Sequence, residues 1–268
     1  MLAEHGLAGP AIGVAADGTG YGADGAIWGC EILLADQADF TRLGHLAYVP
    51  LPGGDQAVRQ PWRLAATHLA QLYGPEFVDL DLPFTRSLDR SRWGVLARMI
   101  ERGLNSPPTS SLGRLFDAAA ALVGLRGEAL YEGQAAIELE TIAERESAPY
   151  PFALTDGAPF QIGVGPTIEA IVGDLRGGAP AGEIAGRFHA TVASFLAAAC
   201  ARARAATGIA TVALSGGVFQ NQLLLARLVR LLAADGFQVY ANRRVPANDG
   251  GISLGQAAVA SERIRRGT

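Results

Sequence analysis

A buried strand that runs into a Gly-Gly turn and then a helix is the feature that most constrains this chain. Residues 212–221 read VALSGGVFQN, and the apolar run 222–232 predicts a helix with Arg227 on its outer face. Because glycine has no Cβ, the backbone at Gly216 and Gly217 can come close to a ligand. The next helix begins with free N–H groups and the positive end of its dipole. The turn therefore predicts a phosphate-binding pocket, and a tight turn without a ligand has the same pattern.

A second glycine-rich segment follows the first predicted strand. Residues 11–22 read AIGVAADGTGYG, so a short apolar strand ends at Asp17. The Asp-Gly pair predicts a β-hairpin with its tip at this point. A hairpin without a ligand explains the pattern. Alternatively, Gly18 and Gly20 admit phosphates to the tip, and Asp17 supplies a hard oxygen ligand for a metal.

A third such segment lies near the end of the chain. Residues 245–256 read VPANDGGISLGQ and open a predicted helix. Either Asn248 or Asp249 caps that helix, or Asp249 is a second carboxylate at the metal. Ligands of open α/β sheets bind beyond the carboxyl ends of the strands. We therefore expect Asp17, Ser215 and Asp249 to surround one cleft.

Composition narrows the class of protein. The chain has 268 residues, 49% of them apolar and 18% charged, which predicts a packed core rather than disorder. The net charge is −4 and no basic stripe occurs, so we expect no nucleic-acid partner. The sequence contains no lysine, which excludes a Walker-type phosphate-binding lysine and Schiff-base chemistry.

Cysteine usage indicates the compartment. Cys30 and Cys200 are the only cysteines, and neither lies in a C-x-x-C pair. We interpret both as small core residues in a reducing environment, and we expect neither a disulfide nor a zinc site. We find no signal peptide and no run of about 18 apolar residues that would span a bilayer. The expectation is a cytoplasmic protein without membrane contact.

Three segments differ in their predicted elements. Residues 1–54 are strand-rich, residues 55–146 are mainly helical, and residues 147–268 return to an α/β pattern. The last segment alternates strands with helices, which indicates parallel βαβ units. We predict strands at 11–16, 27–34, 40–49, 209–214 and 237–241, a strand pair or loop within 147–165, and helices at 58–72, 93–104, 110–123, 134–144, 166–175, 181–206, 222–234 and 252–264.

Six motifs, in this order, resemble those of HypF-type carbamoyltransferases, which mature nickel-iron hydrogenases. They are DGTGYG from residue 17, PLPGGD from 50, SSLGRLFD from 110, YEGQAA from 131, SGGVFQN from 215 and NDGG from 248. The resemblance runs from residue 12 to about residue 260 and covers the family's C-terminal, threonylcarbamoyltransferase-like part. It implies an α/β fold of the actin/hexokinase/Hsp70-like nucleotide-binding type, incomplete at the N-terminus. Residues 55–146 would be a helical insertion that lines the nucleotide cleft.

The resemblance also implies roles for single residues. Asp17 and Asp249 match family ligands of a divalent metal (Mg²⁺, Zn²⁺ or iron) and are the catalytic candidates. The family's two histidine ligands, a His-x-x-x-His pair before the first strand, have no counterpart here, since His5 stands alone. Arg114 either binds a phosphate or lies on a solvated face. The implied nucleotide-binding residues are Gly18, Gly20, Gly113, Asp117, Glu132, Ser215, Gly216, Gly217, Asn221 and Asn248.

The activity implied by the resemblance is carbamoyl transfer through carbamoyl-adenylate, with ATP and carbamoyl phosphate as sources in the full-length family. The implied acceptor is the C-terminal cysteine thiolate of the partner HypE, for the cyanide ligands of the hydrogenase iron. The metal would act as a Lewis acid, and the Gly-Gly amides would stabilise phosphate charge. The family's acylphosphatase, zinc-finger and adenylating domains have no counterpart in this sequence, so we expect a fragment or a misplaced start.

Alternatives remain open. The chain is also compatible with a non-catalytic nucleotide-binding module or subunit, or with a relative of the antibiotic O-carbamoyltransferases. A sugar-kinase-like member of the same fold would use Asp55 as its base. At the level of single residues, helix capping explains Asn221, and Ser110 or Ser111, as well as ligand contact does.

Overall fold

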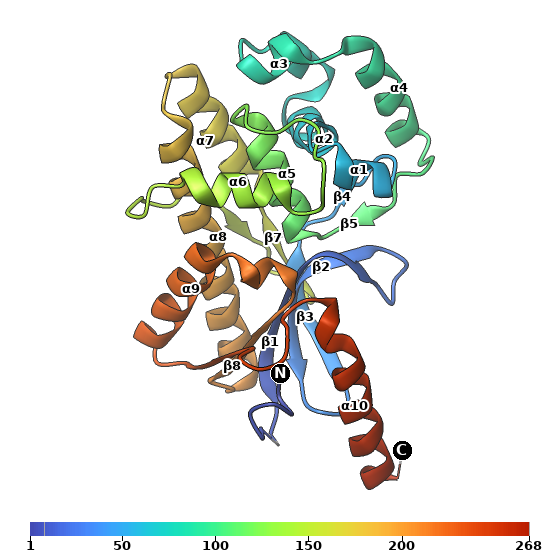
Figure 1. Cartoon of the computed structure of the whole chain (residues 1–268), viewed down its shortest axis with the longest axis vertical. Helices are drawn as coiled ribbons and strands as arrows, with labels where there is room; N and C mark the ends of the chain where they lie inside the picture. The colour runs from blue at the N-terminus through green and yellow to red at the C-terminus, as the bar shows by residue number, and fades with distance from the viewer. Residues whose placement is uncertain (8, 268) are drawn as a thin grey trace.

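A mixed β-sheet forms the centre of the molecule, with helices packed around it (Figure 1). The computed structural model describes residues 1–7 and 9–267. Within this part of the chain nine strands form one sheet, whose main path runs β6-β7-β3-β2-β1-β8-β9. The strands are β1 Ala11–Tyr21, β2 Ile27–Ala35, β3 Phe40–Leu46, β4 Val49–Pro50, β5 Pro108–Thr109, β6 Ala153–Leu154, β7 Phe160–Gly163, β8 Thr211–Ser215 and β9 Gln238–Ala241.

The strand β1 joins the first and last parts of the chain. It pairs antiparallel with β2 and parallel with β8, and β8 pairs parallel with β9. The helix α9 (Gln222–Ala234) connects β8 to β9, so the predicted parallel βαβ unit is confirmed. The predicted strand pair within 147–165 is confirmed as well, because β6 and β7 pair antiparallel.

Helices α1 to α6 form a lobe beyond one end of the sheet (Figure 1). The predicted helix 58–72 is divided into α1 and α2 at Pro61, because proline lacks an N–H and disfavours helical backbone before it. The 3-10 turn η1 and the helix α3 were not predicted. The remaining elements are α1 Asp55–Arg59, α2 Trp62–Tyr73, η1 Gly74–Asp79, α3 Pro83–Ser87, α4 Arg90–Glu101, α5 Leu112–Leu122, α6 Gln134–Ile142, α7 Gly165–Arg176, α8 Ala181–Thr207, η2 Gly217–Gln220, η3 Asp249–Gly251 and α10 Ile252–Arg266.

The hydrophobic core lies between the sheet and α8. Ile12 and Val14 alternate along β1 and are fully buried, and so are Phe188 and Phe195 on α8. Buried residues from all three predicted segments belong to one hydrophobic cluster. The segments therefore share a core, and their division into structural units stays a prediction.

The helix α8 corrects one expectation from the sequence. By length and composition it is apolar enough to cross a membrane, although we expected no such run. However, 72% of its most apolar window is buried inside the structure. Its apolar side chains are thus used by the core of this fold.

The position of Arg227 differs from a second expectation made from the sequence. Arg227 does not lie on the outer face of α9 but is buried, and its guanidinium donates hydrogen bonds to the carbonyl oxygens of Gly186 and Glu144. A buried charge must be paired or hydrogen-bonded, and these carbonyls supply the bonds. The helical pattern alone could not show that they come from distant parts of the sequence.

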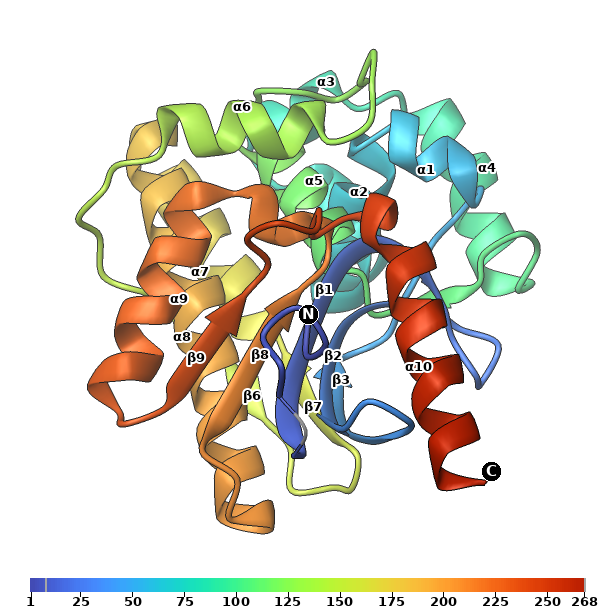
Figure 2. The same cartoon turned by 60° about the horizontal axis from the view of Figure 1, so that its bottom comes forward.

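The helix α10 lies on the other face of the sheet from α8 (Figure 2) and buries none of its residues. Val259 shares a cavity of about 280 Å³ with Leu33, on the face of β2 that points away from the core. An ion pair of 2.9 Å between Arg266 and Asp36 holds the last turn. The polar contacts of α10 with the segment between β2 and β3 thus lie in its last turn.

Two buried histidines make stability depend on pH. Burial lowers the pKa of both His68 and His189 to about 4, from an ordinary value near 6.5. Between these values the unfolded chain binds more protons than the folded chain, so the free energy of unfolding falls as the pH falls. We expect His68→Gln to reduce the slope of unfolding free energy against pH by about 1.4 kcal/mol per pH unit between pH 6 and 5, measured by urea denaturation. Equal slopes in the variant and the wild type would contradict this.

Candidate functional site

One cavity of about 380 Å³ brings together eight of the residues singled out in the sequence. They come from five separate segments: the middle of β1, the first half of α5, the turn before α6, η2, and η3 with the residue before it. The eight are Asp17, Gly18, Gly113, Asp117, Glu132, Gly217, Asn248 and Asp249. A glycine-rich segment within β1 and the loops that follow β8 and β9 thus meet at one place. The strand-end expectation holds for the loops after β8 and β9.

Two adjoining cavities hold the other four predicted residues. Gly20, Ser215 and Gly216 line a cavity of about 460 Å³, together with Asp17 and Asp249. Asn221 lines a cavity of about 290 Å³, which shares Gly113, Glu132 and Gly217 with the first cavity. All the predicted site residues therefore surround one connected hollow, and their roles toward a ligand remain predictions.

The Asp17 segment is a bulge within β1, which corrects the predicted hairpin tip. Pairing of β1 with β2 continues on both sides of it, and the register shifts between Ala16 and Gly20. The turn of the hairpin comes later, at residues 22–26. A bulge bends its strand and redirects the side chains at that point. It leaves Asp17 at the cavity, where its Oδ1 accepts a hydrogen bond of 2.8 Å from the Gly18 N–H.

Two of the glycines allow a close contact between two backbone segments of this chain. A Cβ on Gly113 would lie 2.8 Å from the Cα of Gly18, so the start of α5 contacts the β1 bulge directly. Gly216 has φ +115° and lies against the backbone of Ala16, where any Cβ would overlap the carbonyl group. From the sequence we expect a ligand at this close approach, because the sequence does not show that the backbone of Ala16 lies opposite Gly216.

Serine and asparagine side chains fix the loops around the cavity. Ser111 caps α5, because its Oγ accepts from the Arg114 N–H at 3.0 Å, and it also donates to the Gly18 carbonyl at 2.6 Å. Asn248 caps η3 by accepting from Gly250 N–H at 3.1 Å. Ser215 donates to the side chain of Asn242 at 3.0 Å. The capping explanations are therefore correct for Ser111 and Asn248, beside any contact with a ligand.

A buried ion pair lines the cavity. Arg114 Nη1 and Asp117 Oδ2 lie 2.8 Å apart, and their side chains are only 4% and 3% exposed. The expectation of a solvated face is therefore wrong for Arg114. Burial raises the pKa of Asp117 to about 6, against the opposing effect of the Arg114 charge. Within the described residues, Arg114 Nε and Nη1 and Asp117 Oδ2 form no hydrogen bond. Buried polar atoms in this state are costly unless a ligand or water bonds to them.

The two predicted metal ligands face the same hollow, but the described chain does not complete a metal site. Asp17 and Asp249 line both larger cavities. Within the described residues no group of three or more histidine, cysteine, aspartate or glutamate side chains is arranged to hold an ion. His5 is used elsewhere, because its Nε2 lies 2.9 Å from the Ala241 carbonyl oxygen. The metal-ligand roles of Asp17 and Asp249 stay predictions.

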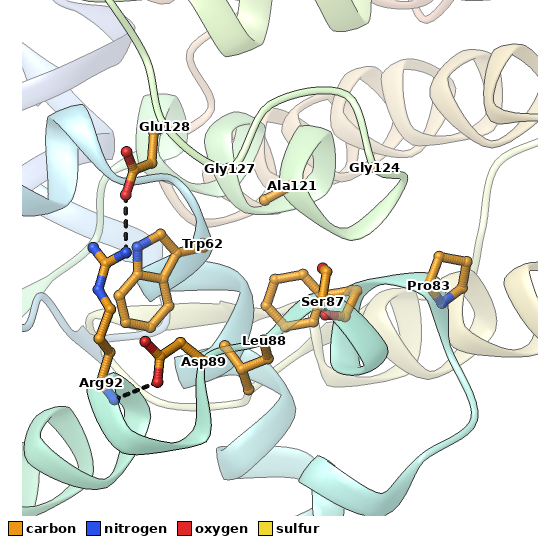
Figure 3. A pocket seen from close by; sticks show the side chains of 11 residues that line it. Trp62, Pro83, Ser87, Leu88, Asp89, Arg92, Ala121, Gly124, Gly127 and Glu128 are labelled. Carbon is orange, nitrogen blue, oxygen red and sulfur yellow. Dashed lines mark hydrogen bonds and ion pairs between the residues drawn. The ribbon is translucent and has the colours of Figure 1, made fainter.

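Another cavity, of about 430 Å³, lies inside the helical lobe and contains none of the predicted residues (Figure 3). Trp62, Leu88 and Ala121 line it, and Arg92 forms an ion pair of 3.0 Å with Glu128 at its edge. Its size resembles that of the cavities at the glycine loops. Cavity volume therefore does not distinguish the candidate site from this cavity, and only the candidate site has the converging glycine loops.

Gly216→Ala tests the close contact between β8 and β1. We expect a loss of about 3 kcal/mol or more in unfolding free energy, because backbone strain at positive φ adds to a backbone overlap. Gly208→Ala is the matched control: it also has positive φ, but nothing lies within 4 Å of its Cβ position. Its expected cost is about 1 kcal/mol. Similar melting temperatures for the two variants would show that the contact at Ala16 is loose.

The chain matches known proteins over nearly its whole length. The family model described as "Carbamoyltransferase, Kae1-like Domain, second subdomain" matches residues 13–256. The carbamoyltransferase HypF2 of Cupriavidus necator is 40% identical over 98% of this chain and 35% of its own length. The carbamoyltransferase HypF of Rhizobium leguminosarum is 41% identical over 98% of this chain and 34% of its own length. The chain thus spans about a third of the length of these curated relatives.

Solved structures agree with the sequence comparison. A full-length HypF in the phosphate- and nucleotide-bound form superposes with a TM-score of 0.91 at 40% identity, over 98% of this chain and 41% of that one. The HypF of T. kodakarensis superposes with a TM-score of 0.82 at 30% identity, over 97% of this chain and 35% of that one. The mixed α/β architecture is accordingly the nucleotide-binding fold expected of the Kae1-like domain. The chain belongs to the HypF carbamoyltransferase family.

Proposed function

We propose that this chain binds carbamoyl-adenylate and transfers the carbamoyl group to a cysteine thiolate of a HypE-type hydrogenase maturation protein. The observation that carries the proposal is the buried Arg114–Asp117 ion pair, whose two residues line the hollow where the glycine loops meet. The similarity to a phosphate- and nucleotide-bound HypF structure supports a nucleotide as the ligand.

The chemistry of the hollow suits the parts of a nucleotide. Asp117 and Glu132 are acceptors for ribose hydroxyls, and Arg114 is a donor for ribose or phosphate oxygens. The adjoining cavity of about 290 Å³ has apolar walls, including Phe116 and Ile137, that suit a base. ATP, AMP and carbamoyl-adenylate share these features. Carbamoyl phosphate and ATP would be the sources of the adenylate in the full-length relatives.

A divalent metal fits the hollow in part. Asp17 and Asp249 would hold it as hard oxygen ligands, with phosphate and water oxygens as further ligands, and Mg²⁺, Zn²⁺ and iron all remain candidates. When bound, such an ion polarises the carbonyl group of an anhydride as a Lewis acid.

The reaction takes its nucleophile from another protein. The thiolate would attack the carbamoyl carbon, a C–S bond would form, and the C–O bond to AMP would break with its electron pair leaving on the phosphate. Burial raises the pKa of Cys200 to about 12 and that of Cys30 further still, so neither is a thiolate near neutral pH. Both are unpaired and buried, which also supports our proposal that the protein works in the cytoplasm.

The alternatives gain less support. Asp55, the base that a sugar kinase would need, begins α1 and lines none of the three joined cavities. A non-catalytic nucleotide-binding module remains the second candidate, because the hollow fits a nucleotide whether or not transfer follows.

Nucleotide binding should depend on the ionisation of Asp117. Binding to ribose hydroxyls needs the carboxylate, whose pKa is raised to about 6, so ATP affinity should weaken by up to tenfold per pH unit below pH 6. Isothermal calorimetry with Mg²⁺ at pH 7.5 and 5.5 measures this. The Asp117→Asn variant should bind ATP weakly at both pH values. The part of the pH dependence that comes from the Asp117 carboxyl group should be absent. An unchanged ATP affinity in Asp117→Asn would show that Asp117 is not part of the nucleotide site.

Arg114→Met should weaken ATP binding at least tenfold, because it removes a charge-assisted hydrogen bond in a buried setting. Arg92→Met is the matched control, since Arg92 lies at the remote cavity and should leave the affinity unchanged. Equal affinities in the two variants would contradict the proposed site.

Transfer itself is tested with labelled carbamoyl-adenylate and a HypE-type protein, followed by mass spectrometry of the acceptor. A gain of one carbamoyl group on the C-terminal cysteine is expected, and Asp249→Ala should reduce its rate by tenfold or more. Tight nucleotide binding without transfer would favour the non-catalytic module instead.

A further inference from the structure

His189 occupies a central position that the proposed chemistry does not use. It is fully buried on α8. Its ring contacts Phe116 edge-on, with 5.2 Å between the ring centres, and Phe116 belongs to the helix that carries Arg114 and Asp117. On its other side it reaches Asn221 at the start of α9. One side chain therefore touches two walls of the proposed base cavity.

Hydrogen bonds link Ala185, His189, Asn221 and Leu224 in a chain, and in each of them it can be determined which group donates. The Ala185 carbonyl oxygen, 2.7 Å from Nδ1, can only accept, so Nδ1 carries the proton. Burial lowers the pKa of His189 to about 4, so the ring is neutral and Nε2 is an acceptor. Asn221 Nδ2 therefore donates to Nε2 at 2.9 Å. The amide oxygen Oδ1 then accepts from the Leu224 N–H at 2.8 Å and caps α9.

This arrangement leaves one polar group of Asn221 unused. The amide nitrogen carries two hydrogens, and only one is engaged by His189. Asn221 lines the cavity of about 290 Å³ beside Gly113 and Gly217. The second N–H is thus a donor available to a ligand in that cavity.

We propose that His189 is a positioning residue, which holds the Asn221 amide so that its free N–H meets an acceptor oxygen of the bound nucleotide. This inference rests on the proposed nucleotide site. His189 acts only through Asn221. Without the acceptor at Nε2, the Asn221 amide is free to rotate. Its orientation is then no longer fixed, so capping of α9 and donation into the cavity compete for the same amide group.

Two substitutions separate positioning from packing. His189→Phe keeps an aromatic ring of similar size and removes both nitrogens, whereas His189→Gln keeps a terminal amide oxygen that can accept. We expect His189→Phe to weaken ATP binding about tenfold and His189→Gln to weaken it less than threefold. A purely structural role predicts the opposite order, since the phenylalanine fills the core better.

A double-mutant cycle with Asn221→Ala tests whether His189 acts through Asn221. In the Asn221→Ala background, His189→Phe should change the dissociation constant by less than twofold. All variants are compared by calorimetry at a temperature at which each is folded. Additive losses, or an unchanged affinity in His189→Phe alone, would overturn the inference.

A readout without nucleotide distinguishes this inference from the proposed function. Nitrogen chemical shifts of His189 in the free protein report the tautomer, and hydrogen exchange reports the Leu224 amide. We expect a proton on Nδ1, and exchange at Leu224 about tenfold faster in His189→Phe. A proton on Nε2, or unchanged exchange, overturns the positioning of Asn221. If these results hold but the wild type binds no ATP or AMP, the proposed nucleotide site fails and only the capping role of His189 survives.

Discussion

The direct contact between the β1 bulge and the start of α5 is the constraint on which the rest of the site depends. Gly113 and Gly18 approach so closely that no side chain fits between them. Ser111 holds the same junction by bonding to the Gly18 carbonyl while it caps α5. This contact joins the helical lobe to the central sheet at the point where the glycine loops converge. Arg114 and Asp117 follow within one turn of helix, so the junction decides where the buried charges lie.

Burial then determines what those charges can do. In water the pair Arg114–Asp117 would be a weak interaction, but both side chains are almost fully enclosed. Desolvation opposes the carboxylate more than the neighbouring guanidinium favours it, which is why the pKa of Asp117 is raised. A ligand that supplies hydroxyl donors to Asp117 and oxygen acceptors to Arg114 would relieve part of this cost. The proposed site would thus gain selectivity for such a ligand from groups that the free protein leaves incompletely bonded.

Much of the site could be predicted from sequence, because its position follows from strand ends. The glycine-rich segments after β8 and β9 had to meet at one edge of the sheet, and the bounds 222–234 of α9 followed from its apolar period. The bulge at Asp17 could not be predicted, since an Asp-Gly pair fits a hairpin turn equally well until the register with β2 is known. Arg227 was misplaced because its carbonyl partners lie far away in sequence. A solvated face was a wrong alternative for Arg114 because α5 is buried on all sides, which its own sequence does not show. The link from His189 to Asn221 spans 32 residues and left no local pattern.

The contrast between β1 and α10 has a consequence for motion. Asp17 belongs to the central strand of the sheet, whereas Asp249 precedes a helix with no buried side chain. Segments with few buried contacts open locally at a small fraction of the global unfolding free energy. We therefore expect the two carboxylates to differ in mobility, with Asp17 fixed in the sheet and Asp249 carried by a segment that opens more easily. An ion or phosphate that bridged them would have to order the second segment as it bound, so part of its affinity would be spent on ordering and ligand exchange would be coupled to the opening of α10.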